Sequence, residues 1–117
     1  MKIVQKPWGR EEIWAHTESY VGKKIIISPW KRLSKQYHVK KEETILVVQG
    51  ILMLETGDIF NLKKLTLLPG ETFHVSPGVI HRFGAGDNEV HLIEVSTPEL
   101  DDVVRIEDDY LRESNRP

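Results

Sequence analysis

Short apolar stretches alternate with turn-forming residues along most of the chain. Within the stretches, apolar positions recur every second residue rather than every 3.6 residues, which is typical of β-strands and not of amphipathic helices. Their length and their content of Ile, Val, Leu and Thr also favour strands. The clearest examples are IIIS (25–28), TILVV (44–48), ILMLE (51–55), KLTLL (64–68), TFHVS (72–76) and HLIEVS (91–96).

Glycine and proline mark the connections between these stretches. Turn-forming clusters fall at 49–50, 56–58, 69–70, 76–78 and 84–88, and such residues either preset φ or accept a positive φ. Closely spaced strands joined by short turns are typical of an antiparallel sandwich or barrel. No stretch before residue 98 has the pattern of a long amphipathic helix, so the sequence predicts an all-β fold.

The C-terminal segment differs from the rest, because it is first acidic and then basic. Val103, Val104 and Ile106 predict one further strand, residues 108–113 predict a short helical turn, and we expect the last few residues to be frayed. The chain shows no internal linker or repeat. We therefore predict a single domain over residues 1–117, with its core at about 7–98 and a C-terminal extension at 99–117.

The composition narrows the classes of function. A chain of 117 residues can bury a sizeable core, and a formal net charge of −2 offers no basic surface for nucleic acid. The absence of cysteine excludes disulfides and thiolate metal sites, and it fits a reducing compartment. No apolar stretch approaches the roughly 20 residues that cross a bilayer, and the N-terminus becomes charged too soon for a signal peptide. We expect a cytoplasmic protein that binds neither nucleic acid nor membranes.

Four polar residues at strand ends form a candidate metal site. Gln36 and His38 lie two residues apart, so in an extended segment both side chains leave the same face. Glu43 follows after five residues and converges with them only if residues 39–42 turn or bulge, and His81 begins a later strand. An amide oxygen, imidazoles and a carboxylate together suit a divalent ion of borderline softness. Taken one by one, the same residues also fit a solvated loop.

Two segments resemble the two-part cupin signature. The first motif, G-x5-H-x-H-x3,4-E-x6-G, is similar to the stretch that ends at Gly50, with Gln36 in place of the first His and Trp30 in place of the leading Gly. The second motif, G-x5-P-x-G-x2-H-x3-N, is similar to the stretch from Gly70 through His81, with Ala85 in place of the final Asn. The resemblance implies a small antiparallel jelly-roll barrel, in agreement with the strand pattern.

Six further segments carry a narrower resemblance that extends from Pro7 to Arg112. They are KPWGREE (6–12), LSKQYH (33–38), ILVVQG (45–50), PGVIHRF (77–83), LIEV (92–95) and DDVVRIEDDYLR (101–112). They look like the cupin part of type II mannose-6-phosphate isomerases. In that family the cupin often forms the C-terminal part of a bifunctional isomerase and sugar-nucleotide pyrophosphorylase. No nucleotidyltransferase segment is present in this sequence, so we do not expect the second activity.

This resemblance implies the identity of the metal ligands. The family holds one divalent ion with Gln, His, Glu and His, which carry over to Gln36, His38, Glu43 and His81 in this chain. We expect zinc first, with manganese, iron, cobalt or nickel as alternatives. One departure is Lys41, where the family usually has Arg ahead of the metal-binding Glu. Lysine keeps the charge but lacks the planar, two-pronged geometry of arginine, which affects the substrate more than the metal.

The resemblance also implies an activity, the interconversion of mannose 6-phosphate and fructose 6-phosphate. A base with a pKa near neutral must carry a proton between C1 and C2, and Glu94 and His74 are the catalytic candidates. The phosphate needs cations, for which Lys41, Arg82 and Arg105 are the candidates. By analogy with small cupins, we expect a homodimer that exchanges N-terminal strands.

Other interpretations stay open, because cupins support many chemistries and some have none. The main alternative is a non-catalytic module that binds a metal and a sugar or organic acid. A dioxygenase would favour iron and three histidines, a set that this chain lacks. His74 alternates with the apolar Phe73 and Val75, so its side chain can equally lie away from any site.

Overall fold

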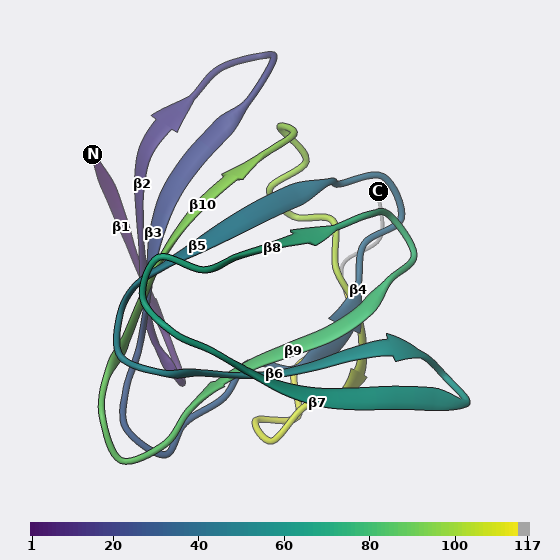
Figure 1. Cartoon of the computed structure of the whole chain (residues 1–117). Helices are drawn as coiled ribbons and strands as arrows, with labels where there is room; N and C mark the ends of the chain where they lie inside the picture. Colours follow the sequence, from purple (N-terminus) through teal and green to yellow (C-terminus); the bar gives the residue numbers. More distant parts are fainter. Residues whose placement is uncertain (115–117) are drawn as a thin grey trace.

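The structure is a computed structural model that describes residues 1–114, and within them it contains eleven β-strands (Figure 1). No helix in these residues is long and apolar enough to cross a membrane. In chain order the strands are β1 (Lys2–Lys6), β2 (Gly9–His16), β3 (Val21–Ile27), β4 (Lys35–Tyr37), β5 (Glu43–Gln49), β6 (Leu52–Asp58), β7 (Asn61–Leu67), β8 (Thr72–Val75), β9 (Ile80–Ala85), β10 (Val90–Ser96) and β11 (Val104–Glu107).

The strands form two antiparallel sheets that face each other (Figure 1). One sheet has six strands in the order β1-β2-β3-β10-β5-β8, and the other has five in the order β11-β4-β9-β6-β7. Consecutive strands repeatedly change sheet, as in a jelly roll. The predicted all-β jelly-roll barrel is confirmed, and the six predicted stretches correspond to β3, β5, β6, β7, β8 and β10.

The core lies between the sheets because alternate residues of each strand point inward. In β5, Ile45 and Val47 are buried, whereas Leu46 and Val48 are exposed. Each fully buried aliphatic or aromatic side chain of this kind contributes about 1.5–3 kcal/mol to folding. The core cluster consists of Trp8, Ile25, Ile27, Leu33, Ile45, Val47, Leu52, Leu54, Val75, Phe83, Val90 and Leu92.

Gly50, the last residue of the first cupin motif, makes the turn from β5 to β6. Its φ is 81°, in the left-handed region that L residues rarely adopt. A Cβ atom at this position would lie 2.4 Å from the carbonyl oxygen of Glu89. Both the backbone conformation and the close approach of a neighbouring chain segment therefore require glycine here.

The C-terminal extension forms part of the five-stranded sheet. The predicted strand around Val104 and Ile106 is β11, and it pairs with β4 so that Arg105 lies opposite Gln36. The expected helical turn at 108–113 is instead a single turn, in which the Leu111 amide donates to the Asp108 carbonyl oxygen at 3.2 Å, followed by irregular chain. Residues 115–117 of the expected frayed end lie outside the described residues. The pairing of β11 places the extension beside the candidate ligands.

Candidate functional site

Three of the four predicted metal ligands face the interior at one end of the barrel. Glu43 begins β5 and His81 is the second residue of β9, and both side chains are buried. They point inward because each lies two residues from a core residue, Ile45 and Phe83 respectively. His38 follows β4 directly and is also buried. The strand alternation and one loop thus bring two imidazoles and a carboxylate into the same interior region.

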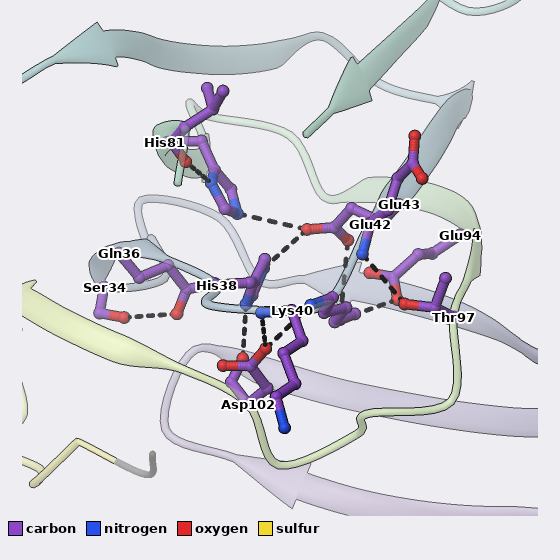
Figure 2. Close-up of polar contacts among 12 residues, drawn as sticks. Ser34, Gln36, His38, Lys40, Glu42, Glu43, His81, Glu94, Thr97 and Asp102 are labelled. Carbon is purple, nitrogen blue, oxygen red and sulfur yellow. Dashed lines mark hydrogen bonds and ion pairs between the residues drawn. The ribbon is translucent and has the colours of Figure 1, made fainter. Parts of the chain in front are cut away.

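These three side chains converge on one point, as Figure 2 shows. The candidate ligand atoms of His38, Glu43 and His81 all lie within 4.8 Å of one another. Glu43 Oε1 is 2.9 Å from Nε2 of His38 and 3.3 Å from Nε2 of His81. The sequence required residues 39–42 to turn for this convergence, and the structure contains that turn. We refer to these three residues as the His-Glu-His group.

The hydrogen bonds of the two rings show that this group fits a cation. Nδ1 of His38 lies 2.6 Å from the carbonyl oxygen of Asp102, and Nδ1 of His81 lies 3.0 Å from that of Val79. A carbonyl oxygen only accepts, so both Nδ1 atoms donate, and in the neutral rings both Nε2 atoms carry lone pairs. Those lone pairs and Glu43 Oε1 face one another, and Nε2 of His81 has no hydrogen-bond partner. Acceptors gathered without a donor are what a divalent metal ion satisfies.

Gln36 lies at the edge of the group. It is opposite His81 in the pairing of β4 with β9, and directly opposed residues in a sheet share a face. Its Oε1 accepts a hydrogen bond of 2.8 Å from the Ser34 hydroxyl (Figure 2). Gln36 also lines a cavity together with His38. The structure therefore places Gln36 beside the group, and its role as a fourth ligand stays a prediction.

A buried lysine joins the group to a second carboxylate. Lys41 Nζ is 3.1 Å from Glu94 Oε2 and 3.8 Å from Glu43 Oε2, and all three side chains are buried. Burial opposes ionisation of Glu43, but the charge of Lys41, together with a hydrogen bond from Glu94, holds the pKa of Glu43 well below its usual range. Burial and the Glu43 charge raise the pKa of Glu94 to about 7, against the pull of Lys23 and Lys41. The two carboxylates thus have opposite tendencies to hold a proton.

Asp102 organises the loop that carries His38, and sequence reasoning missed it. Its carboxylate accepts hydrogen bonds from the backbone amides of Val39, Lys40 and Lys41 at 3.0, 2.6 and 2.8 Å. Its carbonyl oxygen accepts the bond from His38 that orients the ring (Figure 2). More than sixty residues separate Asp102 from these partners along the chain, and the acidic extension offered no local signal for this contact. Asp102 creates the turn at 39–42.

A cavity of about 80 Å3 opens beside His38 and Gln36. Residues of the C-terminal extension form one wall, among them Arg105, whose substrate-binding role was predicted. Lys41, the second predicted substrate residue, also lines the cavity. The sequence did not single out the other charged residues here as site residues, although Lys6, Glu11 and Arg112 lie in segments that carry the family resemblance. The charged side chains other than Asp102 that line the cavity are Lys6, Glu11, Lys23, Lys41, Arg105 and Arg112.

The remaining two predicted residues lie elsewhere. Arg82 follows His81 in β9 and so points to the opposite face, where its Nε donates to the Leu33 carbonyl oxygen at 2.9 Å. His74 lies on the outer face of β8, half-exposed, with Nε2 2.6 Å from a carboxylate oxygen of Glu42. The structure brings neither residue into the His-Glu-His group or the cavity. Their substrate-binding and catalytic roles stay predictions without geometric support.

Comparison with known proteins shows the family of this chain. A family model described as "Mannose-6-phosphate isomerase C-terminal" matches residues 1–108. The chain belongs to this family. It is 32% identical over 113 residues to xanthan biosynthesis protein XanB of Xanthomonas campestris pv. campestris (strain B100), covering 93% of this chain and 23% of the relative. It is 34% identical over 113 residues to mannose-1-phosphate guanylyltransferase ManC of Salmonella typhimurium (strain LT2), again covering 93% and 23%. This member of the family thus spans about a quarter of the length of its curated relatives.

Solved structures share its fold. CapF, a capsular polysaccharide assembling protein from Staphylococcus aureus, superposes with a TM-score of 0.78 at 17% identity, over 91% of this chain and 34% of CapF. KdgF from Halomonas sp. superposes with a TM-score of 0.73 at 20% identity, over 84% and 88% of the two chains. At these identities the likeness concerns the fold alone. Together with the family match, it confirms the resemblance to a cupin of the mannose-6-phosphate isomerase type.

Proposed function

We propose that this family member binds one divalent metal ion and interconverts an aldose phosphate and a ketose phosphate, with mannose 6-phosphate and fructose 6-phosphate as the pair. The observation that carries the proposal is the convergence of two imidazole lone pairs and one carboxylate oxygen of the His-Glu-His group in the barrel interior. Membership of the mannose-6-phosphate isomerase C-terminal family supports the choice of substrate. His38, Glu43 and His81 would hold the ion, with Gln36 as the fourth ligand and zinc as the first candidate.

A bound divalent cation supplies Lewis-acid polarisation of a sugar carbonyl. The chain itself must hold the sugar beside the ion and move one proton between C1 and C2. Of the two predicted proton carriers, Glu94 lies beside the group, where it shares Lys41 with Glu43. Oε2 of Glu94 lies 3.1 Å from Lys41 Nζ and forms an ion pair with it, but the atom has no hydrogen-bond partner of good geometry. We assign the proton transfer to Glu94.

The test compares metal content with turnover. We expect the purified protein to contain about one divalent ion per chain, to interconvert the two sugar phosphates, to lose this activity on chelation and to regain it with zinc or manganese. His38→Ala should lose both the ion and turnover while its circular dichroism stays that of a folded β protein. His16→Ala, at an exposed position in β2, is the matched control and should keep both. Undiminished turnover by protein without bound metal would refute the proposal.

The second candidate function is a non-catalytic module that binds a metal and a sugar or organic acid. Lys41 favours it, because this buried lysine stands where the resemblance places an arginine and is engaged by two carboxylates. Metal-loaded protein that binds fructose 6-phosphate without turning it over would establish this alternative. The homodimer and the cytoplasmic location stay predictions, and light scattering of the purified protein tests the first.

A further inference from the structure

The cavity beside the His-Glu-His group contains more positive than negative side chains. Two carboxylates, those of Glu11 and Asp102, line it, and Asp102 is engaged by three backbone amides. This excess is local, because the whole chain has a net charge of −2. The cationic side chains that line the cavity are Lys6, Lys23, Lys41, Arg105 and Arg112.

Three of these five cations are neutralised within the protein. Each has a carboxylate oxygen within about 3 Å, so a neighbouring side chain already compensates most of its charge and little of that charge is available to a ligand. The pairs, with their N–O distances, are Lys23–Glu11 (2.8 Å), Lys41–Glu94 (3.1 Å) and Arg112–Asp108 (2.9 Å).

Lys6 and Arg105 are the two cations of the cavity that have no carboxylate oxygen closer than 4.0 Å among residues 1–114. The carboxylate nearest to Lys6 is that of Glu11, at 4.0 Å, and it already pairs more closely with Lys23. Arg105 has no carboxylate within ion-pair distance in the described part of the chain; one of its terminal nitrogens donates to the Glu113 carbonyl oxygen, and its buried Nε has no acceptor. A buried guanidinium nitrogen without an acceptor is costly unless a ligand supplies one.

The pKa values of these two cations have the direction expected for charge that is only partly compensated. Burial lowers the pKa of Lys6, and the charges of Lys23, Arg112 and Arg105 lower it further, although Glu11 acts in the opposite direction. Burial and the charge of Arg112 also lower the pKa of Arg105, against the opposing effect of Asp108. An anion bound between the two would relieve this repulsion.

We propose that Lys6 and Arg105 form an anion subsite that holds the phosphate of a phosphate monoester in this cavity. The inference rests on the proposed function for the identity of the sugar, but the subsite itself follows from the long ion pair of Lys6 and the absence of a carboxylate partner for Arg105 among the described residues. A guanidinium binds phosphate oxygens with two parallel hydrogen bonds, and a lysine adds a point charge. Gln36 and His38 line the same cavity, so a phosphate held here lets the rest of the ligand reach the His-Glu-His group. The subsite replaces Lys41 and Arg82 as phosphate ligands and retains Arg105.

The test titrates inorganic phosphate into the full chain after chelation, so that coordination to a metal does not contribute, and follows binding by calorimetry and 31P NMR. We expect saturable binding that weakens roughly tenfold to a hundredfold in Arg105→Gln and in Lys6→Gln, since a hydrogen bond to a charged group is worth about 1.5–3 kcal/mol. Arg105→Lys should recover part of the affinity. The matched controls are Lys35→Gln and Arg10→Gln, whose cations pair with Glu107 and Glu12, and they should bind as the parent does.

Equal phosphate affinity in the parent and in folded Arg105→Gln would overturn the subsite, as would competition by acetate as strong as that by phosphate. The outcome is separable from that of the proposed function. Phosphate binding that depends on Lys6 and Arg105, without isomerisation, supports the subsite and rejects the isomerase. Isomerisation whose KM for mannose 6-phosphate is unchanged in Arg105→Gln and Lys6→Gln supports the isomerase and rejects the subsite.

Discussion

The two ends of the barrel interior are formed by the same strands and yet have opposite chemistry. One end is filled with apolar side chains, and the other holds the His-Glu-His group and buried charges. In each of four central strands, one inward-facing polar residue and one inward-facing apolar residue lie two positions apart, and the interior changes from polar to apolar between them. These polar and apolar positions are Glu43 and Ile45 in β5, His81 and Phe83 in β9, Glu94 and Leu92 in β10, and Lys23 and Ile25 in β3.

This difference shows how a small barrel accommodates a polar site. Burial of isolated charges is very unfavourable, and it is tolerated when opposite charges alternate and are hydrogen-bonded. At the polar end the charges do alternate along a row of five side chains, those of Glu11, Lys23, Glu94, Lys41 and Glu43. The N–O distances between successive members of the row are 2.8, 3.7, 3.1 and 3.8 Å. Burial of the apolar side chains at the other end stabilises the fold.

The largest expected effect on stability comes from the apolar end. Phe83→Ala should lower the free energy of unfolding by about 3–5 kcal/mol, because it removes a large buried side chain and leaves a cavity. Urea denaturation of the zinc-free protein measures this loss. Phe60→Ala is the control, since the Phe60 side chain is 95% exposed. A loss below about 1 kcal/mol in Phe83→Ala would contradict the division between the two ends.

A change at the polar end should affect metal binding more than folding. Asp102→Asn places an amide group where three backbone amides need an acceptor, at a cost of about 1–3 kcal/mol in unfolding free energy. Because Asp102 holds the loop of His38, we also expect zinc affinity to fall roughly tenfold to a hundredfold. Competition with a zinc-binding dye and urea denaturation measure the two effects. Asp101→Asn, at the exposed neighbour, is the control, and unchanged zinc affinity in Asp102→Asn would argue against this positioning role.

The smallest effect is expected outside the barrel. The pair of His74 and Glu42 is half-exposed, and exposed ion pairs contribute about 0–1 kcal/mol to stability. His74→Gln should therefore change the unfolding free energy by less than about 1 kcal/mol and leave zinc affinity unaltered. His38→Gln provides the contrast, because it removes an imidazole from the group. Loss of zinc binding in His74→Gln would show that the site extends beyond the His-Glu-His group.

The amino-acid sequence alone determined the fold class and the inward face of most strands. Alternation of apolar residues places Ile45 and Phe83 inside, and the same period of two places Glu43 and His81 inside as well. It also directs Arg82, next to His81, to the opposite face. The resemblance added the identity of the candidate metal ligands.

Only the tertiary structure decided which distant side chains complete the site. Asp102, Lys6 and Arg112 belong to segments far from His38 in sequence, and no local pattern distinguishes them from solvated charges. The pairing of β11 with β4 and the position of β1 at the sheet edge bring them to the cavity. The physical reason is that local periodicity sets a strand and its faces, whereas the choice of neighbouring strands depends on packing across the whole barrel.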